Sequence, residues 1–156
     1  METRWKRPES VLVVVMTLAD DVLMMRRVTP PHFWQSVTGS LHWGESPRLA
    51  AERELYEETG LRASGRLRDL QRSVLFPIRP AWRARYAPTA RFNREHWFAL
   101  ELPGRRLIRQ NPQEHREALW LRCPEALRRA TSWTNRSAIR QSSHPSSNRQ
   151  TPCFGR

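Results

Sequence analysis

Apolar and polar positions along the chain follow two different periodicities. Short apolar or alternating runs rich in valine and leucine are typical of strands, and the run VLVVVMT predicts a strand that is fully buried. Asp20 and Asp21 supply the turn that follows this run. The predicted strands cover residues 11–17, 22–25, 34–41, 67–76, 97–102 and 118–121.

One helix is predicted together with both of its ends. Ser46 suits the N-cap and Pro47 the first helical position, where the missing N–H of proline is harmless. The helix is expected to run to Thr59 and to end at Gly60. Strands and helices interleave without a strict repeat, which predicts an α/β fold with a mixed sheet and helices on both faces. Shorter helices are predicted at residues 124–129 and 133–140, and proline-bearing loops at 28–33 and 79–95.

Length and composition indicate one domain. We assign residues 1–140 to that domain and expect the polar, low-complexity segment 141–156 to be a disordered tail. No apolar run approaches the roughly 18 to 20 residues of a membrane span, and the N-terminal segment does not resemble a secretory signal. Cys123 and Cys153 lack metal-type spacing and fit a reducing compartment without a disulfide framework. These features predict a cytoplasmic protein without a membrane partner.

The chain is strongly basic, with 27 lysine and arginine residues against 15 acidic residues and a net charge of +12. Nucleic acid is one partner that would explain this balance. The arginines are scattered through every segment instead of forming one stripe, and Lys6 is the only lysine. An anionic small molecule explains part of the excess equally well, so the charge alone does not identify the partner.

Negative charge is concentrated on the long predicted helix. Glu54, Glu57 and Glu58 share one helical face, and two alanines one turn earlier are expected to leave open space above them. Like-charged pairs at this spacing cost about 0.2 to 0.5 kcal/mol each. Such a cluster is most often a solvated face, but hard divalent cations that prefer several oxygen ligands would turn the repulsion into binding.

The residues around this cluster carry a more specific pattern. Gly39, Glu45 and the segment 53–61 fill every fixed position of G-x5-E-x7-R-E-U-x-E-E-x-G-U, where U is aliphatic. The sequence thereby resembles the Nudix hydrolases, which cleave nucleoside diphosphates linked to another group. The resemblance implies an α/β/α sandwich with a mixed β-sheet and a requirement for Mg²⁺, with Mn²⁺ as a substitute.

The same resemblance implies roles for the residues of the pattern. Glu54 and Glu58 would ligate the metal, and Glu57 would be a further ligand or support the attacking water. Arg53 would orient the carboxylates, while Glu45 would be structural. We therefore expect Glu57, Glu58 and Arg53 to be catalytic.

Three other segments resemble one branch of the family. Residues 33–40, 85–103 and 132–139 are similar to the bacterial dihydroneopterin triphosphate pyrophosphohydrolases of folate synthesis. This implies hydrolysis of dihydroneopterin triphosphate to the monophosphate and pyrophosphate, with Glu114 as an additional metal ligand. The substrate contacts implied in this way are Lys6, Arg27, Thr38, Phe76, Pro77, Ile78, Arg79, His115 and Ser132.

Two alternatives remain open from the residues. One is a broader (deoxy)nucleoside triphosphate pyrophosphohydrolase acting on compounds such as dATP, because the fold and the pattern are common to both. The other is a non-catalytic module that binds nucleotide or RNA, which the intact acidic pattern disfavours. A small polyphosphate is therefore the expected partner, and the oligomeric state is left open. Phe33 and Trp34 are candidates for stacking on a pterin, although aromatics beside a strand are more often core residues.

Overall fold

The computed structural model describes residues 4–143, which form one mixed seven-stranded sheet with helices on both faces. Strands are ordered β3-β2-β1-β6-β5, with β4 paired to β1 and β7 paired to β2. The strands are β1 (Glu9–Thr17), β2 (Asp21–Arg27), β3 (Trp34–Gln35), β4 (Val37–Ser40), β5 (Leu67–Pro77), β6 (Phe92–Leu102) and β7 (His115–Arg122). The helices are α1 (Pro47–Thr59), the 3₁₀ helix η1 (Pro80–Arg85), α2 (Cys123–Arg129) and α3 (Trp133–Ser142).

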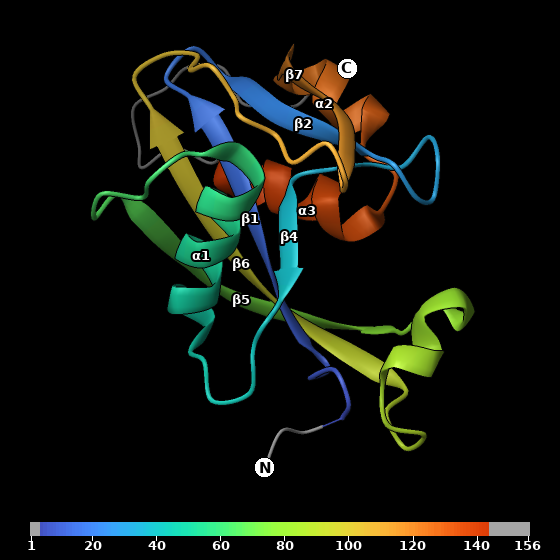
Figure 1. Ribbon diagram of the computed structural model, residues 1–156. Helices are drawn as coiled ribbons and strands as arrows, with labels where there is room; N and C mark the ends of the chain where they lie inside the picture. The colour runs from blue at the N-terminus through green and yellow to red at the C-terminus, as the bar shows by residue number, and fades with distance from the viewer. Residues whose placement is uncertain (1–3, 144–156) are drawn as a thin grey trace.

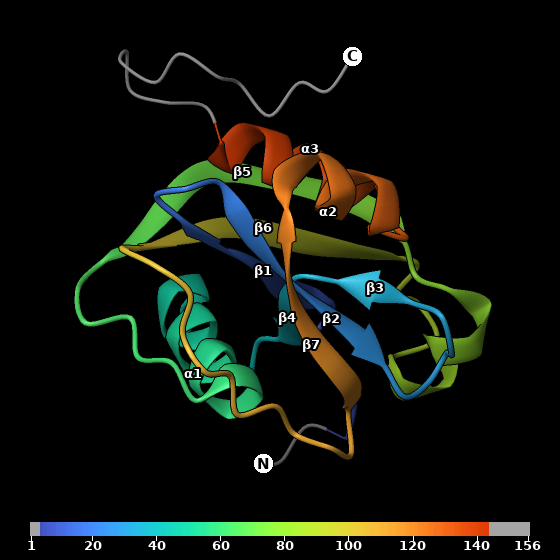
Figure 2. The same ribbon diagram turned by 90° about the horizontal axis from the view of Figure 1, so that it is seen from above.

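β1 is the central strand, and its unbroken apolar sequence explains this position. It pairs in parallel with β6 along its whole length and antiparallel with β2 and β4. Figure 2 shows α1 below the sheet and α2 with α3 above it. A strand covered on both faces buries every side chain, so it reads as a continuous hydrophobic run instead of an alternating one.

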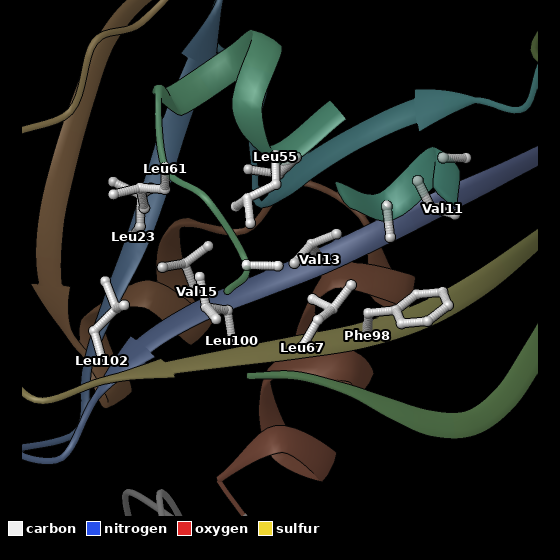
Figure 3. Close-up of a cluster of buried hydrophobic side chains, with 14 of the residues drawn as sticks. Val11, Val13, Val15, Leu23, Leu55, Leu61, Leu67, Phe98, Leu100 and Leu102 are labelled. Carbon is white, nitrogen blue, oxygen red and sulfur yellow. The ribbon is translucent and has the colours of Figure 1, made fainter. Parts of the chain in front are cut away.

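The two faces of β1 build two separate cores. Val11, Val13 and Val15 pack with Leu55 of α1 and with Phe98, as Figure 3 shows. The alternate residues of β1 pack on the other face against α2 and α3 (Figure 1). This arrangement confirms the predicted α/β/α sandwich with a mixed sheet.

The predicted helices and strands are present, except that the single strand expected at residues 34–41 is divided at Ser36 into β3, which pairs with β2, and β4, which pairs with β1. The other main differences lie between residues 79 and 95. This segment is expected to be one long loop, but residues 80–85 form η1 and β6 already begins at Phe92. The start of β6 buries Asn93 and Glu95 while Phe92 and Arg94 are exposed. Because the inward positions are polar, hydrophobic periodicity does not indicate a strand there.

Two further expectations concern the chain ends and the cysteines. Helix α3 continues to Ser142, two residues past the predicted boundary, and residues 144–156 of the predicted tail lie outside the described residues. No helix within residues 4–143 has the length and apolar character needed to cross a membrane. The expectation that the cysteines form no disulfide is wrong for Cys123, which is disulfide-bonded, because spacing along the chain does not reveal which thiols meet in space. Cys153 lies outside the described residues.

Candidate active site

Helix α1 is formed as its sequence predicts, and it carries the acidic pattern. The Ser46 hydroxyl accepts the Leu49 N–H at 3.3 Å, and Gly60 ends the helix with φ of 76° and donates to the Tyr56 carbonyl. Ala50 and Ala51 are fully buried against the sheet. The expectation that they leave open space above the carboxylates is therefore wrong, because their small size is used for close packing of α1.

Arg53 connects the acidic residues of the pattern to one another. Its guanidinium donates to both carboxylate oxygens of Glu45 at 2.8 Å, to Glu54 Oε1 at 2.8 Å and to the Ser40 carbonyl at 2.9 Å. A longer bond of 3.3 Å reaches Glu57 Oε2. Hydrogen bonding from Arg53 lowers the pKa of Glu45 to about 2, so this carboxylate is ionised and held in place. This geometry supports a structural role for Glu45 and an orienting role for Arg53.

Gly39 is required by the position of Glu54. A Cβ atom at residue 39 would collide with the Glu54 carboxyl group. The Glu54 carboxyl group lies between Arg53 and the β4 backbone only because residue 39 has no side chain.

We expect Gly39→Ala to reduce kcat/KM by about tenfold or more, because misplacing a reacting group by about 1 Å has large kinetic effects. The melting temperature should change little, since the displaced carboxyl group is the end of a flexible side chain. Steady-state kinetics and thermal melting measure the two effects. Gly104→Ala is the control, because a Cβ there would meet no atom within 4 Å. Unchanged kinetics in Gly39→Ala would show that the position of Glu54 is unimportant.

Glu54 and Glu58 are held in conditions that disfavour their charge. Glu58 is 3% exposed, and its Oε2 has no hydrogen-bond partner in the described part of the chain. Burial, followed by Glu54 and Glu114, raises the pKa of Glu58 well above its ordinary value. Burial also raises the pKa of Glu54 to about 7, although Arg53 opposes this shift. A divalent cation would offset both effects, so these residues fit a metal site.

Glu57 has a different environment from its two neighbours. Its side chain is 54% exposed and does not line the cavity described below. Within residues 4–143, no three carboxylate, imidazole or thiol groups already converge on one cation position. Glu54, Glu58 and Glu114 are close enough to influence one another's charge, so a cation would draw together groups that are already neighbours.

A cavity of about 1200 Å³ brings together residues from distant parts of the chain. It is bordered by Glu54, Glu58 and Glu114 and by every predicted substrate contact. Arg53, which is bonded to Glu54, and Glu57 do not line it. The predicted residues that line it are Lys6, Arg27, Thr38, Glu54, Glu58, Phe76, Pro77, Ile78, Arg79, Glu114, His115 and Ser132.

One part of the cavity combines basic and acidic side chains. Burial lowers the pKa of Lys6, with Arg85 and Arg27 adding to the effect, while Glu54 and Glu114 oppose it. Burial also lowers the pKa of Arg27, and Glu58 and Glu114 oppose that shift. Two cationic groups therefore face the carboxylate cluster, as a site for a metal-bound polyphosphate requires.

The remaining predicted contacts are held by local interactions. Ser132 caps α3 and accepts from the Asn135 N–H at 3.2 Å and side-chain amide at 2.8 Å. Arg79 lies 5.1 Å from the centre of the Phe33 ring. His115 is 1% exposed with Nε2 at 3.2 Å from Gln35 Nε2, and burial followed by Arg27 lowers its pKa to about 4, so its imidazole is neutral at pH 7.

Several cavity residues are not indicated by the sequence pattern. Asn93 and Glu95 point inward from β6, while Trp82 and Tyr86 line the cavity from the segment around η1. The only signal for the first two is the alternation of polar residues along residues 92–95, which is visible only once a strand is known to lie there.

Comparison with known proteins agrees with this geometry. A family model described as the NUDIX domain matches residues 6–141. The chain is 45% identical over 143 residues to the dihydroneopterin triphosphate diphosphatase of Escherichia coli strain K12, covering 88% of this chain and 93% of that protein. It is 37% identical over 142 residues to the protein of the same name from Haemophilus influenzae, covering 88% and 89%. The solved structure of the E. coli dihydroneopterin triphosphate pyrophosphohydrolase superposes with a TM-score of 0.81 at 43% identity, covering 89% of this chain and 97% of that one. The chain belongs to the Nudix family.

Proposed function

We propose that this protein is an Mg²⁺-dependent pyrophosphohydrolase that converts dihydroneopterin triphosphate to dihydroneopterin monophosphate and pyrophosphate. Nudix hydrolases generally use divalent metal ions. The observation that carries the proposal is one cavity in which Glu54, Glu58 and Glu114 face Lys6 and Arg27. The names of the similar E. coli and H. influenzae proteins support the choice of substrate.

Glu54, Glu58 and Glu114 would hold the metal. When bound, Mg²⁺ or a substituting Mn²⁺ neutralises phosphate oxygens and makes a bound water nucleophilic near neutral pH. Arg53 keeps the Glu54 carboxylate in position through its 2.8 Å hydrogen bond. Lys6 and Arg27 bind the phosphate oxygens that lie beyond the carboxylates. Glu57, which is exposed beside Arg53, supports the attacking water or adds a further ligand.

The remaining assignments follow from this substrate. We assign residues 1–140, together with the last residues of α3 up to Ser142, to one catalytic domain. A triphosphate carries several charges and does not cross a lipid bilayer unaided, which supports a cytoplasmic location. The cavity encloses its basic residues beside carboxylates, which suits a small polyphosphate better than a nucleic-acid backbone.

The substrate assignment is tested by parallel kinetics on dihydroneopterin triphosphate and dATP. We expect at least about a tenfold higher kcat/KM for the pterin, because a site built to pair one hydrogen-bonding edge disfavours a base that leaves buried groups unpaired. Chromatography should detect pyrophosphate as the product. Equal efficiency on deoxynucleotides would favour the broader triphosphate pyrophosphohydrolase, and release of single phosphates would contradict both.

The role of Glu114 is tested by Glu114→Ala. We expect this change to raise the Mg²⁺ concentration for half-maximal rate by about tenfold, since an oxygen ligand is lost. Glu117→Ala is the matched control three residues further along the chain, because Glu117 lies 3.7 Å from Arg26 and does not line the cavity. An equal Mg²⁺ dependence in the two variants would remove Glu114 from the metal site.

A further inference from the structure

Glu95 is a buried acidic residue that the proposed reaction does not use. It lies on β6, is 5% exposed and lines the cavity. The Trp97 indole donates to its Oε1 at 3.0 Å, and the Thr134 hydroxyl is hydrogen-bonded to the same carboxyl group. A carboxylate accepts about four hydrogen bonds, so these two leave capacity for a ligand.

Glu95 lies apart from the charged end of the cavity. Burial raises its pKa to about 7, and the two hydrogen bonds from Trp97 and Thr134 oppose the shift. No charged side chain of the described residues contributes to this pKa, whereas Glu54 and Glu58 are affected by each other or by Glu114. Glu95 is bonded to Trp97 and to Thr134 of α3, whereas Glu54 and Glu58 belong to α1 on the other face of the sheet (Figure 2). The cavity therefore has a charged end at α1, where the phosphates would bind, and a separate polar end at α3.

A second acceptor without a partner lies at this polar end. Asn93, two residues before Glu95 and on the same face of β6, is 4% exposed and lines the cavity. Its amide donates to Ser10 Oγ at 2.7 Å, but its Oδ1 is buried with no hydrogen-bond partner in the described chain. Burying an acceptor without a partner is unfavourable, so the region favours a ligand rich in hydrogen-bond donors.

The two oxygens of a carboxylate match a planar pair of adjacent N–H donors. The amino-pyrimidinone edge of a pterin presents such a pair, a ring N–H beside an exocyclic amino group. Guanine presents the same pair, whereas adenine, cytosine and uracil do not. Parallel, charge-assisted hydrogen bonds of this type add both binding strength and directional selectivity.

We propose that the Glu95 carboxylate binds the amino-pyrimidinone edge of the substrate and thereby selects pterin over adenine. This inference rests on the proposed function, because the triphosphate must occupy the opposite end of the cavity. Asn93 supplies a further acceptor beside this edge. The competing explanation is structural: Glu95 only holds the Trp97 indole in the core between β6 and α3.

Glu95→Gln separates these explanations. A glutamine can still accept the Trp97 N–H through its carbonyl oxygen, but its NH₂ group then faces the ligand donors. We expect neopterin, followed by its fluorescence, to bind at least about tenfold more weakly, while inhibition by inorganic tripolyphosphate is unchanged. The kcat/KM for dihydroneopterin triphosphate should fall by a similar factor, with that for dATP changing less than about threefold. Glu125→Gln, on the surface of α2, is the control and should alter none of these values.

A measurement on the unchanged protein covers the case in which the variant does not fold. Pterin should bind at least about tenfold more tightly than lumazine, which carries an oxygen in place of the amino group. The inference is overturned if pterin and lumazine bind with equal affinity. It is also overturned if Glu95→Gln weakens the binding of neopterin and of tripolyphosphate to the same extent. Hydrolysis of dihydroneopterin triphosphate that does not depend on Glu95 overturns it while leaving the proposed function intact. Binding of pterin through Glu95 without hydrolysis overturns the proposed function alone.

Discussion

Replacing Glu58 with glutamine is expected to lower kcat by about 10² or more, because it removes charge where the metal would be held. Glu58 is the most deeply buried carboxylate of α1, and one of its oxygens has no protein partner among the described residues. Steady-state kinetics at saturating Mg²⁺ measures the loss. Glu52→Gln is the matched control, since Glu52 lies on the same helix but does not line the cavity. Equal kcat values for Glu58→Gln and the parent protein would contradict the assignment of Glu58 to the metal site.

The same substitution should stabilise the metal-free protein at neutral pH. The folded-state pKa of Glu58 is raised above its ordinary value of 4.5, so the folded state binds the proton more tightly than the unfolded state. The stabilisation that this tighter proton binding provides is present below about pH 4.5 and is lost as the pH rises through the folded pKa of Glu58. Glu58→Gln should therefore melt at a higher temperature than the parent at pH 7 without metal, and this gain should disappear near pH 4. Added Mg²⁺ should raise the melting temperature of the parent more than that of the variant.

Arg53→Ala is expected to reduce both stability and activity. The change leaves the half-buried Glu45 and Glu54 carboxylates and the Ser40 carbonyl without their shared donor. We expect the free energy of unfolding to fall by about 2 to 4 kcal/mol, because these groups lose their hydrogen-bond donor while they remain largely buried. We expect kcat to fall by about 10² or more, because Glu54 is no longer held in position. Urea denaturation and steady-state kinetics measure the two effects.

The stability loss in Arg53→Ala should depend on pH. Because Arg53 lowers the folded pKa of Glu45 to about 2, the stabilisation is present above the ordinary value of 4.5 and is lost as the pH falls through about 2. The difference from the parent should therefore be largest at pH 7 and smaller at pH 3. Arg53→Lys should not restore the parent values, since an ammonium lacks the planar guanidinium fork. Arg62→Ala, which removes an exposed arginine 4.4 Å from the Tyr56 ring, is the control and should cost less than about 1 kcal/mol. A pH-independent loss would contradict the role assigned to the Arg53–Glu45 pair.

The elements that follow from local chemistry were determined by the sequence. Ser46, Pro47 and Gly60 define the two ends of α1 through interactions among neighbouring residues. The apolar run of β1 requires cover on both faces wherever it lies in the fold. The acidic pattern is equally local, because the spacing of Glu54 and Glu58 along α1 follows directly from helical geometry.

The depth of each carboxylate was decided by tertiary structure alone. Helical spacing places Glu57 and Glu58 on the same face, yet Glu58 is buried and Glu57 is more than half exposed. Only the packing of α1 against the sheet determines which edge of that face is covered. The same packing uses Ala50 and Ala51 for contact with the core, so they do not open space for a ligand.

The composition of the cavity likewise depended on the tertiary fold. Lys6, Arg27 and Glu114 are far apart in the sequence, and their charges interact only because the segment before β1, the end of β2 and the segment before β7 meet in the fold. Asn93 and Glu95 face inward from the start of β6 although both are polar. Hydrophobic periodicity identifies strands by the apolar side chains that they bury. It therefore does not predict a strand where the inward side chains are polar and line a binding cavity.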